Sequence, residues 1–417
     1  MPEFDLLTTA IIIAGLVAIV MSIVGYATLA ERKVSAWIQD RVGPNRVGPL
    51  GLLQPLADGG KLFLKESPIP SHVDKVFYLL APAAAMAIAL MALAVVPWGG
   101  TTPAPKPVAV ESAKDGKPDY SKAVQQYDEQ QGEYRGQFQG MIAPGLDIGL
   151  VYVFALGSLA IYAVILGGWS SDNKYSLLGS LRSSAQIISY EIPLGMSIVG
   201  VVLFAGSMNL ETIIAWQKQN GWFLMFQPLA FLLFMVSVYA ECNRLPFDLP
   251  ESEQELVGGY LTEYGSLKFG MFMLGEYTHM ITTSFLMSII FWGGWSLFGL
   301  EDSFSDPIAA AVLKAGILGA KMLGFLLMYI VVRWTIPRFR FDQLMGLAWK
   351  VMIPLSLLHL LAAMLVRQFG WSNWVLTGIS TGLFVAFGLI AAIKKSAPNN
   401  TPRRKLIPKM LPRVMAS

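Results

Sequence analysis

The sequence predicts an all-α integral membrane protein, a multi-span helical bundle of about nine transmembrane helices with interfacial amphipathic helices on its inner side. Two observations lead to this fold class. Hydrophobic residues make up 54% of the 417 residues and charged residues only 14%, whereas a soluble domain carries roughly 25% charged residues. In addition, nine stretches are apolar over about the 20 residues that a helix needs to cross a bilayer. We therefore expect one membrane domain over residues 1–417.

The nine predicted spans follow one another along the chain. They cover residues 6–30, 76–97, 143–167, 185–206, 223–241, 268–298, 309–334, 348–367 and 373–393. The first span is not predicted to be a signal peptide, because the residues before it are acidic and its apolar run is too long. The last span is followed by a basic tail over residues 394–417.

The distribution of Lys and Arg predicts the orientation, because these residues favour the cytoplasmic side. The connection 31–75 carries seven of them, the tail after residue 393 carries seven more, and the connection 335–347 holds Arg338 and Arg340. Nine spans place the two termini on opposite sides of the membrane. An outside N-terminus and a cytoplasmic C-terminus then bring all three basic segments inside.

Several classes of function are excluded by composition. The net charge of +3 argues against a nucleic-acid-binding protein, which needs a basic face. The only cysteine, Cys242, excludes a disulfide scaffold and an iron–sulfur cluster held by this chain alone. The three histidines, His72, His279 and His359, show no metal-ligand spacing, so no metal site is predicted.

Two connections depart from the simple pattern. The outside connection 98–142 is long and polar and is expected to be a solvated insertion. The inside connection 242–267 holds one Arg and five carboxylates, namely Asp248, Glu251, Glu253, Glu255 and Glu263. It is either an ordinary solvated loop or a functional segment with a short surface helix after Pro250.

Ionisable residues inside the spans are the strongest functional signal, since such groups are costly in lipid. At about 1.5 Å of rise per residue, Glu191 and Glu276 lie roughly 10 Å from the inner ends of their spans. Glu31 and Glu241 close the inner ends of two others. These groups either pair with one another structurally or form a proton relay, because desolvated carboxylates near like charges titrate near neutral pH.

The inside connection 31–75 has an unusual beginning. Its Gly43-Pro44 and Gly48-Pro49 pairs predict turns, and the leucine-rich run that follows, with its charged side chains, can form an amphipathic helix in the interface. It is either an interfacial anchor or an access path for an amphiphilic ligand with apolar walls.

Long strings along the chain match a known family. They read ERKVSAWIQDRVGPNRVGP at 31–49, GSLRSSAQ at 179–186, ISYE at 188–191, AECNRLPFDLPESEQELVGGYLTEY at 240–264, GEYTH at 275–279 and PRFRFDQLM at 337–345. In these strings the chain resembles the family of the quinone-site membrane subunit of NADH:quinone oxidoreductase (respiratory complex I).

The resemblance implies a subunit that forms much of a quinone tunnel together with two hydrophilic partners, one of which holds the terminal iron–sulfur cluster. It implies that quinone is the substrate, that no cofactor is bound covalently, and that FMN, NADH and iron–sulfur clusters bind only to partner subunits. It further implies an acidic chain that transmits quinone reduction to antiporter-like, proton-pumping membrane subunits. The resemblance therefore implies a protein that is part of a translocase of the bacterial cell inner (plasma) membrane and is not catalytic alone.

The resemblance also assigns residues. The quinone-tunnel positions are Glu31, Arg32, Asp58, Tyr277 and Arg333. The proton-coupling positions are Glu191, Glu241, Glu251, Glu253, Glu255, Glu263 and Glu276. Most of these carboxylates also stand out by their place in the predicted membrane, whereas Asp58 and Tyr277 rest on the resemblance alone.

Two other functions remain open from the sequence. One is a related subunit of a membrane-bound hydrogenase-type complex, and the other is a stand-alone proton-coupled transporter, which would leave the segment 31–66 unexplained. The insertion 98–142, the ninth span and the basic tail extend beyond the core usual in the family, and none of them touches the matched strings.

Overall fold

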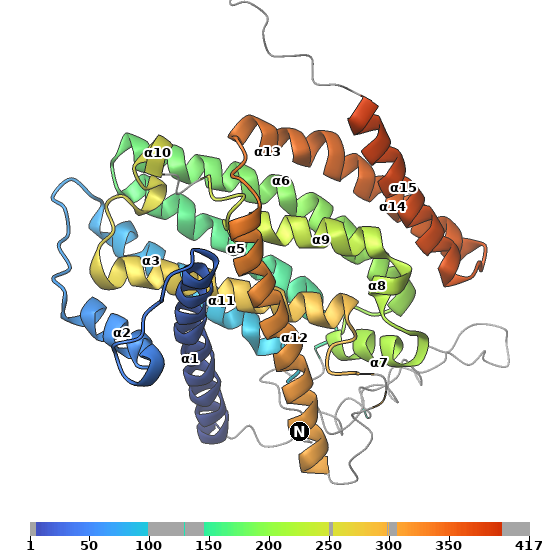
Figure 1. Cartoon of the computed structure of the whole chain (residues 1–417), viewed down its shortest axis with the longest axis horizontal. Coiled ribbons are helices and arrows are strands. Elements are labelled where there is room, and N and C mark those ends of the chain that lie inside the picture. Colours follow the sequence, from blue (N-terminus) through green and yellow to red (C-terminus); the bar gives the residue numbers. More distant parts are fainter. Residues whose placement is uncertain are drawn as a thin grey trace, which may run out of the picture.

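The computed structural model describes residues 6–98, 146–249, 253–297 and 307–393, together with the isolated positions 129 and 299. Within these ranges the chain is helical, with turns and loops and without a β-strand (Figure 1). Nearly all of the predicted insertion 98–142 and the whole of the tail 394–417 lie outside the described residues.

Fourteen helices are described. They are α1 (Leu6–Ile38), α2 (Gln54–Leu64), α3 (Lys75–Met91), α5 (Gly149–Ser170), α6 (Lys174–Ala205), α7 (Leu210–Asn220), α8 (Phe223–Phe226), α9 (Pro228–Glu241), α10 (Glu253–Leu256), α11 (Ser266–Phe291), α12 (Pro307–Thr335), α13 (Phe341–Leu347), α14 (Ile353–Gln368) and α15 (Asn373–Ile393). A π-helical turn over Ala348–Met352 joins α13 to α14.

Six helical stretches of the described residues are long and apolar enough to cross a membrane. They are Ile13–Ile38, Lys75–Val95, Gly149–Ser170, Lys174–Ala205, Ala309–Thr335 and Phe341–Gln368. Two shorter apolar helices cover Pro228–Glu241 and Asn373–Leu389. The chain is thus a helical membrane protein, while nine crossings remain a prediction.

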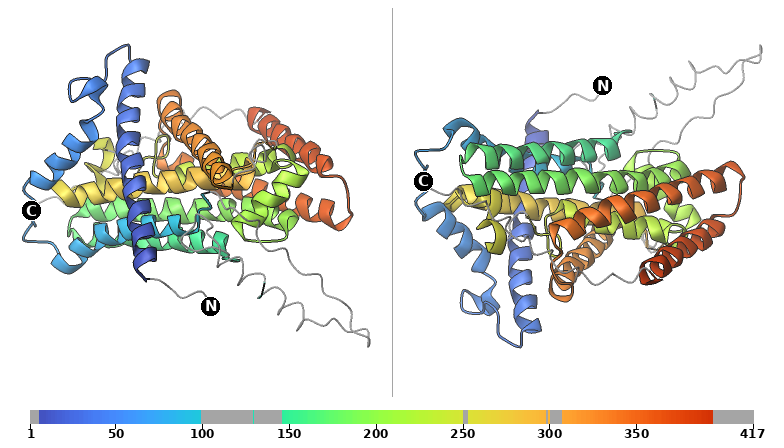
Figure 2. Two further views of the ribbon diagram at one scale, coloured as in Figure 1. Left: turned by 90° about the horizontal axis from the view of Figure 1, so that it is seen from below. Right: turned by 90° about the horizontal axis from the view of Figure 1, so that it is seen from above.

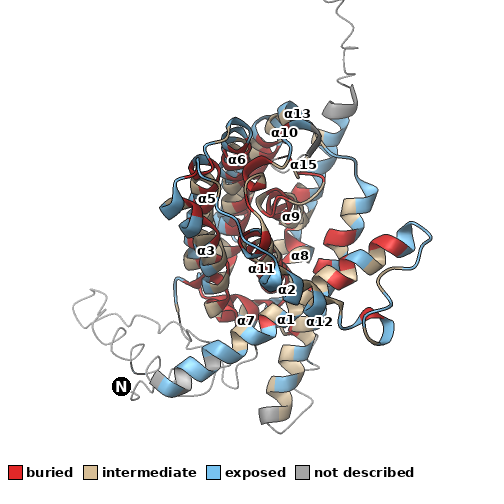
Figure 3. Cartoon of the chain, turned by 90° about the vertical axis from the view of Figure 1, so that its left-hand side faces the viewer, coloured by how far each residue is buried: buried red, intermediate tan, exposed pale blue. Residues whose placement is uncertain are grey.

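The predicted span at 268–298 corresponds to α11, which does not belong to these six. The helix packs against α1, α3, α9 and α12, and its second half, from Met280 to Phe291, is buried throughout. Figure 3 shows α11 among the other helices of the bundle. Because protein rather than lipid surrounds this helix, it tolerates Lys268, Glu276 and His279 among its apolar residues.

The helix boundaries differ from the predicted spans where polar residues continue a helix. α6 begins at Lys174, eleven residues before the predicted span, and Asn173 caps it by accepting a hydrogen bond from the Tyr175 amide (3.0 Å). This first part is rich in serine and packs under the turn Gly259–Leu261. α6 ends at Ala205, and the capping residue that follows it, Gly206, has a positive φ of 72° that suits glycine.

The arrangement of the helices brings separate connections together. Figure 2 shows α1 crossing α5, α6 and α11 steeply, and α1 contacts α2, α11 and α12. At one end of the bundle, the Asp74 amide donates to the Ser170 carbonyl (3.0 Å) and the Phe339 amide donates to the Pro246 carbonyl (3.2 Å). The connections that follow α1, α5, α9 and α12 therefore share this end, which is the predicted inner side.

Candidate functional site

Four polar side chains from α1, α11, α12 and the loop after α9 meet at the predicted inner end of the bundle. The buried carboxylate of Glu31 accepts a hydrogen bond from the Tyr277 hydroxyl (2.5 Å) and forms an ion pair with Arg333. Arg244 approaches the same carboxylate (3.8 Å) and places its guanidinium 4.2 Å from the centre of the Tyr277 ring. Three predicted tunnel residues thus form one cluster, and Arg244 joins them.

The other two predicted tunnel residues form a separate pair. Arg32 and Asp58 make an ion pair of 2.6 Å between α1 and α2, and Gln54 donates to the other oxygen of Asp58 (2.9 Å). The pair is partly exposed to solvent, so its contribution to stability is small. It holds α2 beside α1, with Leu56, Phe63 and Leu64 of α2 exposed.

A cavity of about 570 Å³ extends from the Glu31 cluster between α1, α11 and α12. Its walls are mostly apolar. They consist of Ala18, Ile19, Ser22, Ile23, Tyr26, Ala27, Ala30, Glu31, Tyr277, Met280, Leu323, Leu326, Leu327 and Ile330. The volume falls within the range of pockets that hold small organic molecules. Glu31 and Tyr277 place polar groups at its inner end.

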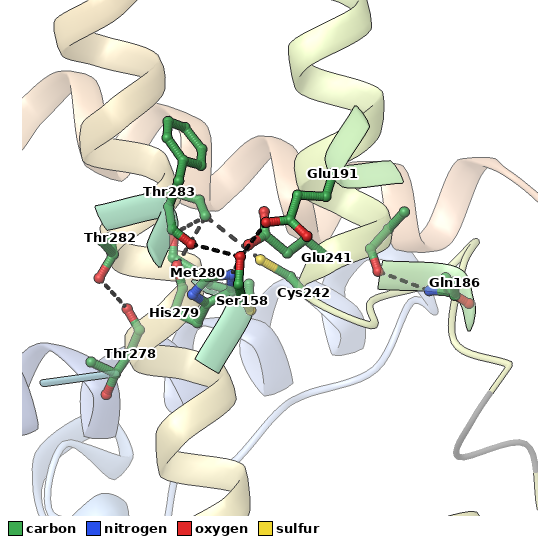
Figure 4. A network of polar contacts seen from close by, with 12 residues as sticks. Ser158, Gln186, Glu191, Glu241, Cys242, Thr278, His279, Met280, Thr282 and Thr283 are labelled. Carbon is green, nitrogen blue, oxygen red and sulfur yellow. Dashed lines mark hydrogen bonds and ion pairs between the residues drawn. The ribbon is translucent and has the colours of Figure 1, made fainter. Parts of the chain in front are cut away.

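Three predicted coupling carboxylates lie deeper in the bundle, each with a polar partner. Glu191 on α6 accepts a hydrogen bond from Ser158 on α5. Glu241 forms an ion pair with His279 (3.4 Å), and Glu276 accepts a hydrogen bond from the Tyr260 hydroxyl (2.7 Å). Figure 4 shows Glu191, Glu241 and His279 turned toward the same region around Ser158.

A second cavity, of about 80 Å³, connects two of these carboxylates. Glu241 and Glu276 both line it, together with Asn243, Tyr260 and His279, and the rest of its wall is largely apolar. A buried water needs roughly 10–15 Å³ and two to four polar partners, so this space suits water.

The predicted residues of the inner loop are placed separately. Glu255 pairs with Arg182 (2.7 Å), and Glu263 accepts from Asn173 (2.8 Å) and lies 3.7 Å from His72. These contacts hold the loop against α6 and the connection before α3. Glu251 lies outside the described residues, and Glu253 begins α10 without a described side chain.

Arg244 and Asp248 lie between the Glu31 cluster and the deeper carboxylates, although the sequence did not assign either residue to the site. Asp248 pairs with Arg338 (3.2 Å), and its other oxygen is buried with no hydrogen-bond partner among the described residues. Burial raises the pKa of Asp248 to about 7, against the attraction of Arg338 and Arg244 and with added repulsion from Glu276. Arg244 is the only Lys or Arg in the acidic connection 242–267 apart from Lys at its far end, beyond residue 267, and this feature of the sequence could have indicated that it belongs to the site.

The arrangement can hold an amphiphilic ligand and move protons. Hydrogen-bond donors and cations at one end of an apolar cavity suit a ligand with polar oxygen atoms and an apolar tail. The carboxylates, the imidazole and the small cavity supply groups that exchange protons. Among the described residues, no cluster of His, Cys, Asp or Glu could hold a metal ion.

Comparisons with known proteins fit this chemistry. The profile of a family described as NADH dehydrogenase matches residues 11–364. The chain is 41% identical over 360 residues to an H-type subunit of the NADH-quinone oxidoreductase of Cytophaga hutchinsonii, covering 86% of this chain and 96% of that protein. It is 42% identical to the corresponding protein of Leptospira biflexa, over 89% and 98% of the two chains. The similarity to the corresponding protein of Deinococcus deserti, at 40% identity, covers 98% of both chains.

Proposed function

The chain belongs to the NADH dehydrogenase family as an H-type subunit of NADH-quinone oxidoreductase, and from this we propose that it forms much of the quinone tunnel and couples quinone reduction to proton pumping. It is a membrane subunit of a bacterial respiratory-chain complex, complex I, and works with the other subunits of that complex. Catalysis belongs to the assembly and not to this chain alone. The family therefore favours this function over a hydrogenase-type subunit and over a stand-alone transporter.

The cavity of about 570 Å³ carries the tunnel proposal. Quinones combine a polar ring with an apolar tail, and this cavity offers Glu31 and Tyr277 at one end and aliphatic walls along the rest. We assign the tail to the apolar walls and the ring to the inner end, toward the partner subunits. Arg32 and Asp58 would hold α2 at the mouth of the path.

The Glu31 cluster supplies charge and hydrogen bonds to the passing ring. Reduction of a quinone adds two electrons and two protons, and an O–H bond forms at each of its two oxygens. Arg333 and Arg244 would stabilise negative charge near these oxygens. Tyr277 and Glu31 share a hydrogen bond, so a change at the ring would change the charge that Glu31 presents to the loop.

The acidic chain would carry this change into the membrane. In our proposal Glu251, Glu253, Glu255 and Glu263 act in the inner loop, and Glu276, Glu241 and Glu191 act in the bundle. Support comes from the cavity that Glu241 and Glu276 share and from the link of Asp248 to both Arg244 and Glu276. Antiporter-like membrane subunits would receive the signal.

The remaining elements of the proposal concern partners and topology. With one cysteine in the chain, the iron–sulfur clusters are assigned to partner subunits. FMN and NADH are assigned to partner subunits because the family resemblance implies it. We propose nine spans, an outside N-terminus and a cytoplasmic C-terminus in the inner (plasma) membrane. The connections 31–75 and 242–267 would then face the hydrophilic partners.

The tunnel is tested by filling the cavity. In the purified complex, Ala27→Phe places a ring among the cavity walls. NADH oxidation by a long-tailed quinone should fall by about tenfold or more, because misplacing a reacting group by about 1 Å costs up to about 10²-fold. NADH oxidation by ferricyanide, which needs no tunnel, should stay unchanged.

Ala14→Phe is the matched control, because Ala14 is exposed on α1 and does not line the cavity. Normal quinone kinetics in Ala27→Phe would show that the quinone does not pass through this cavity. Glu31→Gln should lower quinone turnover as well, and a normal rate there would exclude the polar cluster from the reaction.

A further inference from the structure

We infer that His279 is a proton-relay residue between Glu276 and Glu241, and that Gly157 is a positioning residue that leaves room for the Glu241 carboxylate. Neither residue belongs to the carboxylate chain assigned above. The inference rests on the proposed coupling function, and it names two groups without which that chain is interrupted.

The need for a relay follows from where the two carboxylates lie. Glu276 is on α11 and Glu241 is the last residue of α9, and the structure shows no direct hydrogen bond between them. Glu276 is instead bound to Tyr260. The imidazole of His279 stands one helical turn after Glu276, on the same face of α11.

His279 has the contacts that a relay requires. Its Nε2 atom lies 3.4 Å from Oε1 of Glu241, and the ring lines the cavity that both carboxylates share. With a volume of about 80 Å³, the cavity has room for water between Glu276 and the ring. The imidazole has two nitrogens on opposite sides, so it can accept a proton at one and release a proton at the other.

The proton transfer balances without another reactant. The O–H bond of protonated Glu276 breaks and an N–H bond forms at Nδ1 of His279, through water. The N–H bond at Nε2 then breaks and an O–H bond forms on the Glu241 carboxylate. Glu276 is left ionised, Glu241 is left protonated, and the ring carries its one N–H proton at Nδ1. The ring returns to its starting tautomer when Nδ1 releases this proton to cavity water and Nε2 takes up a proton from cavity water.

The surroundings of His279 leave few other groups for this role. The cavity wall from α3, α5 and α6 is built of aliphatic residues and glycine. The titratable groups that line the cavity besides His279 are Glu241, Cys242, Tyr260 and Glu276. Of the titratable side chains in the wall, only His279 lies between the two carboxylates: it pairs with Glu241 and stands one helical turn from Glu276.

Gly157 controls where the Glu241 carboxylate can lie. A Cβ atom at this position on α5 would stand 2.8 Å from Oε1 of Glu241, closer than side chains normally allow. Because the atom in the way is the end of a flexible side chain, an added methyl group would displace the carboxylate rather than the helix. The next residue, Ser158, donates a hydrogen bond to Glu191. The glycine thus lets Glu241 reach the part of α5 that contacts the next carboxylate of the chain.

The test uses the assembled complex in proteoliposomes. His279→Gln keeps a hydrogen-bonding side chain but cannot relay a proton, and Gly157→Ala displaces Glu241 without altering the histidine. His359→Gln is the control for losing a buried histidine. His359 lies on α14 and does not line the shared cavity, and its ring shares a hydrogen bond with Ser380 on α15 (3.1 Å). Gly195→Ala is the control for the glycine, because nothing lies within 4 Å of its added Cβ.

We expect coupled NADH:quinone turnover and proton uptake to fall by about tenfold or more in His279→Gln, since a positioned acid–base group contributes on the order of 10²–10⁴-fold to its step. Gly157→Ala should show a fall of at least about threefold, as the carboxylate is moved and not removed. Ferricyanide reduction should match the wild type in every variant, and both controls should keep wild-type coupling.

If Glu276→Gln is impaired but His279→Gln shows wild-type turnover and proton pumping, the relay role of His279 is overturned. If Glu276→Gln and Glu241→Gln were also normal, the proposed coupling function itself would fail. If His279→Gln did not assemble, Gly157→Ala would decide, and its normal pumping would contradict the inference.

Discussion

Glu211 shows how strongly a single position can depend on the packing around it. The residue lies in the first turn of α7, on the predicted outer side, and is only 3% exposed. Neither carboxylate oxygen has a hydrogen-bond partner among the described residues. Burial raises the pKa of Glu211 to about 8, although Lys314 acts in the opposite direction.

This pKa predicts a loss of stability with rising pH. Between the ordinary value of 4.5 and about 8, the unfolded chain releases a proton that the folded chain keeps, so the free energy of unfolding falls as the pH rises. Each pKa unit corresponds to about 1.4 kcal/mol. Glu211→Gln should therefore unfold a few degrees above the wild type at pH 8 and close to it at pH 4.5.

Cys242 provides the measurement, because the only cysteine is 2% exposed and reacts with a thiol-sensitive dye when the isolated chain unfolds in detergent. Glu66→Gln, at an exposed carboxyl, should show no such pH-dependent difference. Equal midpoints of Glu211→Gln and wild type at pH 8 would show that the burial of this carboxyl costs nothing.

Asp248 is expected to titrate within the working pH range. Its pKa of about 7 means that its charge, which acts on Arg338, Arg244 and Glu276, changes between pH 6 and pH 8. We expect Asp248→Asn to flatten the part of the quinone reductase pH profile near pH 7 and to lower turnover above it. Asp342→Asn, at an exposed pair with Arg340, is the control. An unchanged pH profile in Asp248→Asn would show that the charge of Asp248 does not affect quinone reductase turnover.

At the scale of the elements, α12 is joined to the end of α11 by one side chain. Nζ of Lys321 donates hydrogen bonds to the carbonyls of Trp292, Gly294 and Ser296, at 2.6 to 2.8 Å. The carbonyls lie just past the C-terminus of α11, where the helix dipole favours a cation. Lys321, in the middle of α12, is therefore expected to fix this helix against the C-terminal end of α11.

Replacing Lys321 tests this connection. A hydrogen bond to a charged group contributes about 1.5–3 kcal/mol, so Lys321→Gln should lower the thermal midpoint of the chain by several degrees. Lys218→Gln, on the exposed face of α7, should leave the midpoint near the wild-type value. A wild-type midpoint in Lys321→Gln would mean that water replaces these bonds at no cost.

The elements also show which predictions depend on local sequence. The amphipathic pattern predicted a helix after the Gly-Pro turns, and α2 forms there. The predicted span 223–241 is two helices, since Pro228 begins α9 and separates it from α8. α6 begins before the predicted span because hydropathy locates continuous apolar runs, whereas the first turns of this helix mix polar and apolar residues and bury only a face of serine and glycine.

At the scale of the whole molecule, the prediction of nine crossings can be tested by finding on which side of the membrane two connections lie. Burial raises the pKa of the Cys242 thiol to about 12, with added repulsion from Glu241, so the native cysteine should not react with maleimides. Ser121→Cys and Ser396→Cys then place single reactive thiols in the predicted outside insertion and the predicted inside tail.

An impermeant maleimide should label position 121 in spheroplasts, where the outer face of the membrane is accessible. It should label position 396 in inverted membrane vesicles, where the cytoplasmic face is accessible. The wild-type chain is the control for background labelling. Labelling of both positions from the same side would exclude nine spans.

The sequence by itself determined the fold class and the family. Membrane crossing depends on the summed hydropathy of consecutive residues, which is a local property, and long matching strings identify the family without any geometry. The sequence also indicated the carboxylates, because a charge inside an apolar run is visible in one dimension.

Only the tertiary structure decided which groups meet. Glu31 and Tyr277 are 246 residues apart and share a hydrogen bond, and Gly157 faces Glu241 from another helix. Such contacts depend on how each helix is rotated and crossed against its neighbours, and side-chain packing over whole helices sets that geometry. For the same reason Arg244, Asp248 and His279, which the sequence did not assign to the site, take central places in the folded chain.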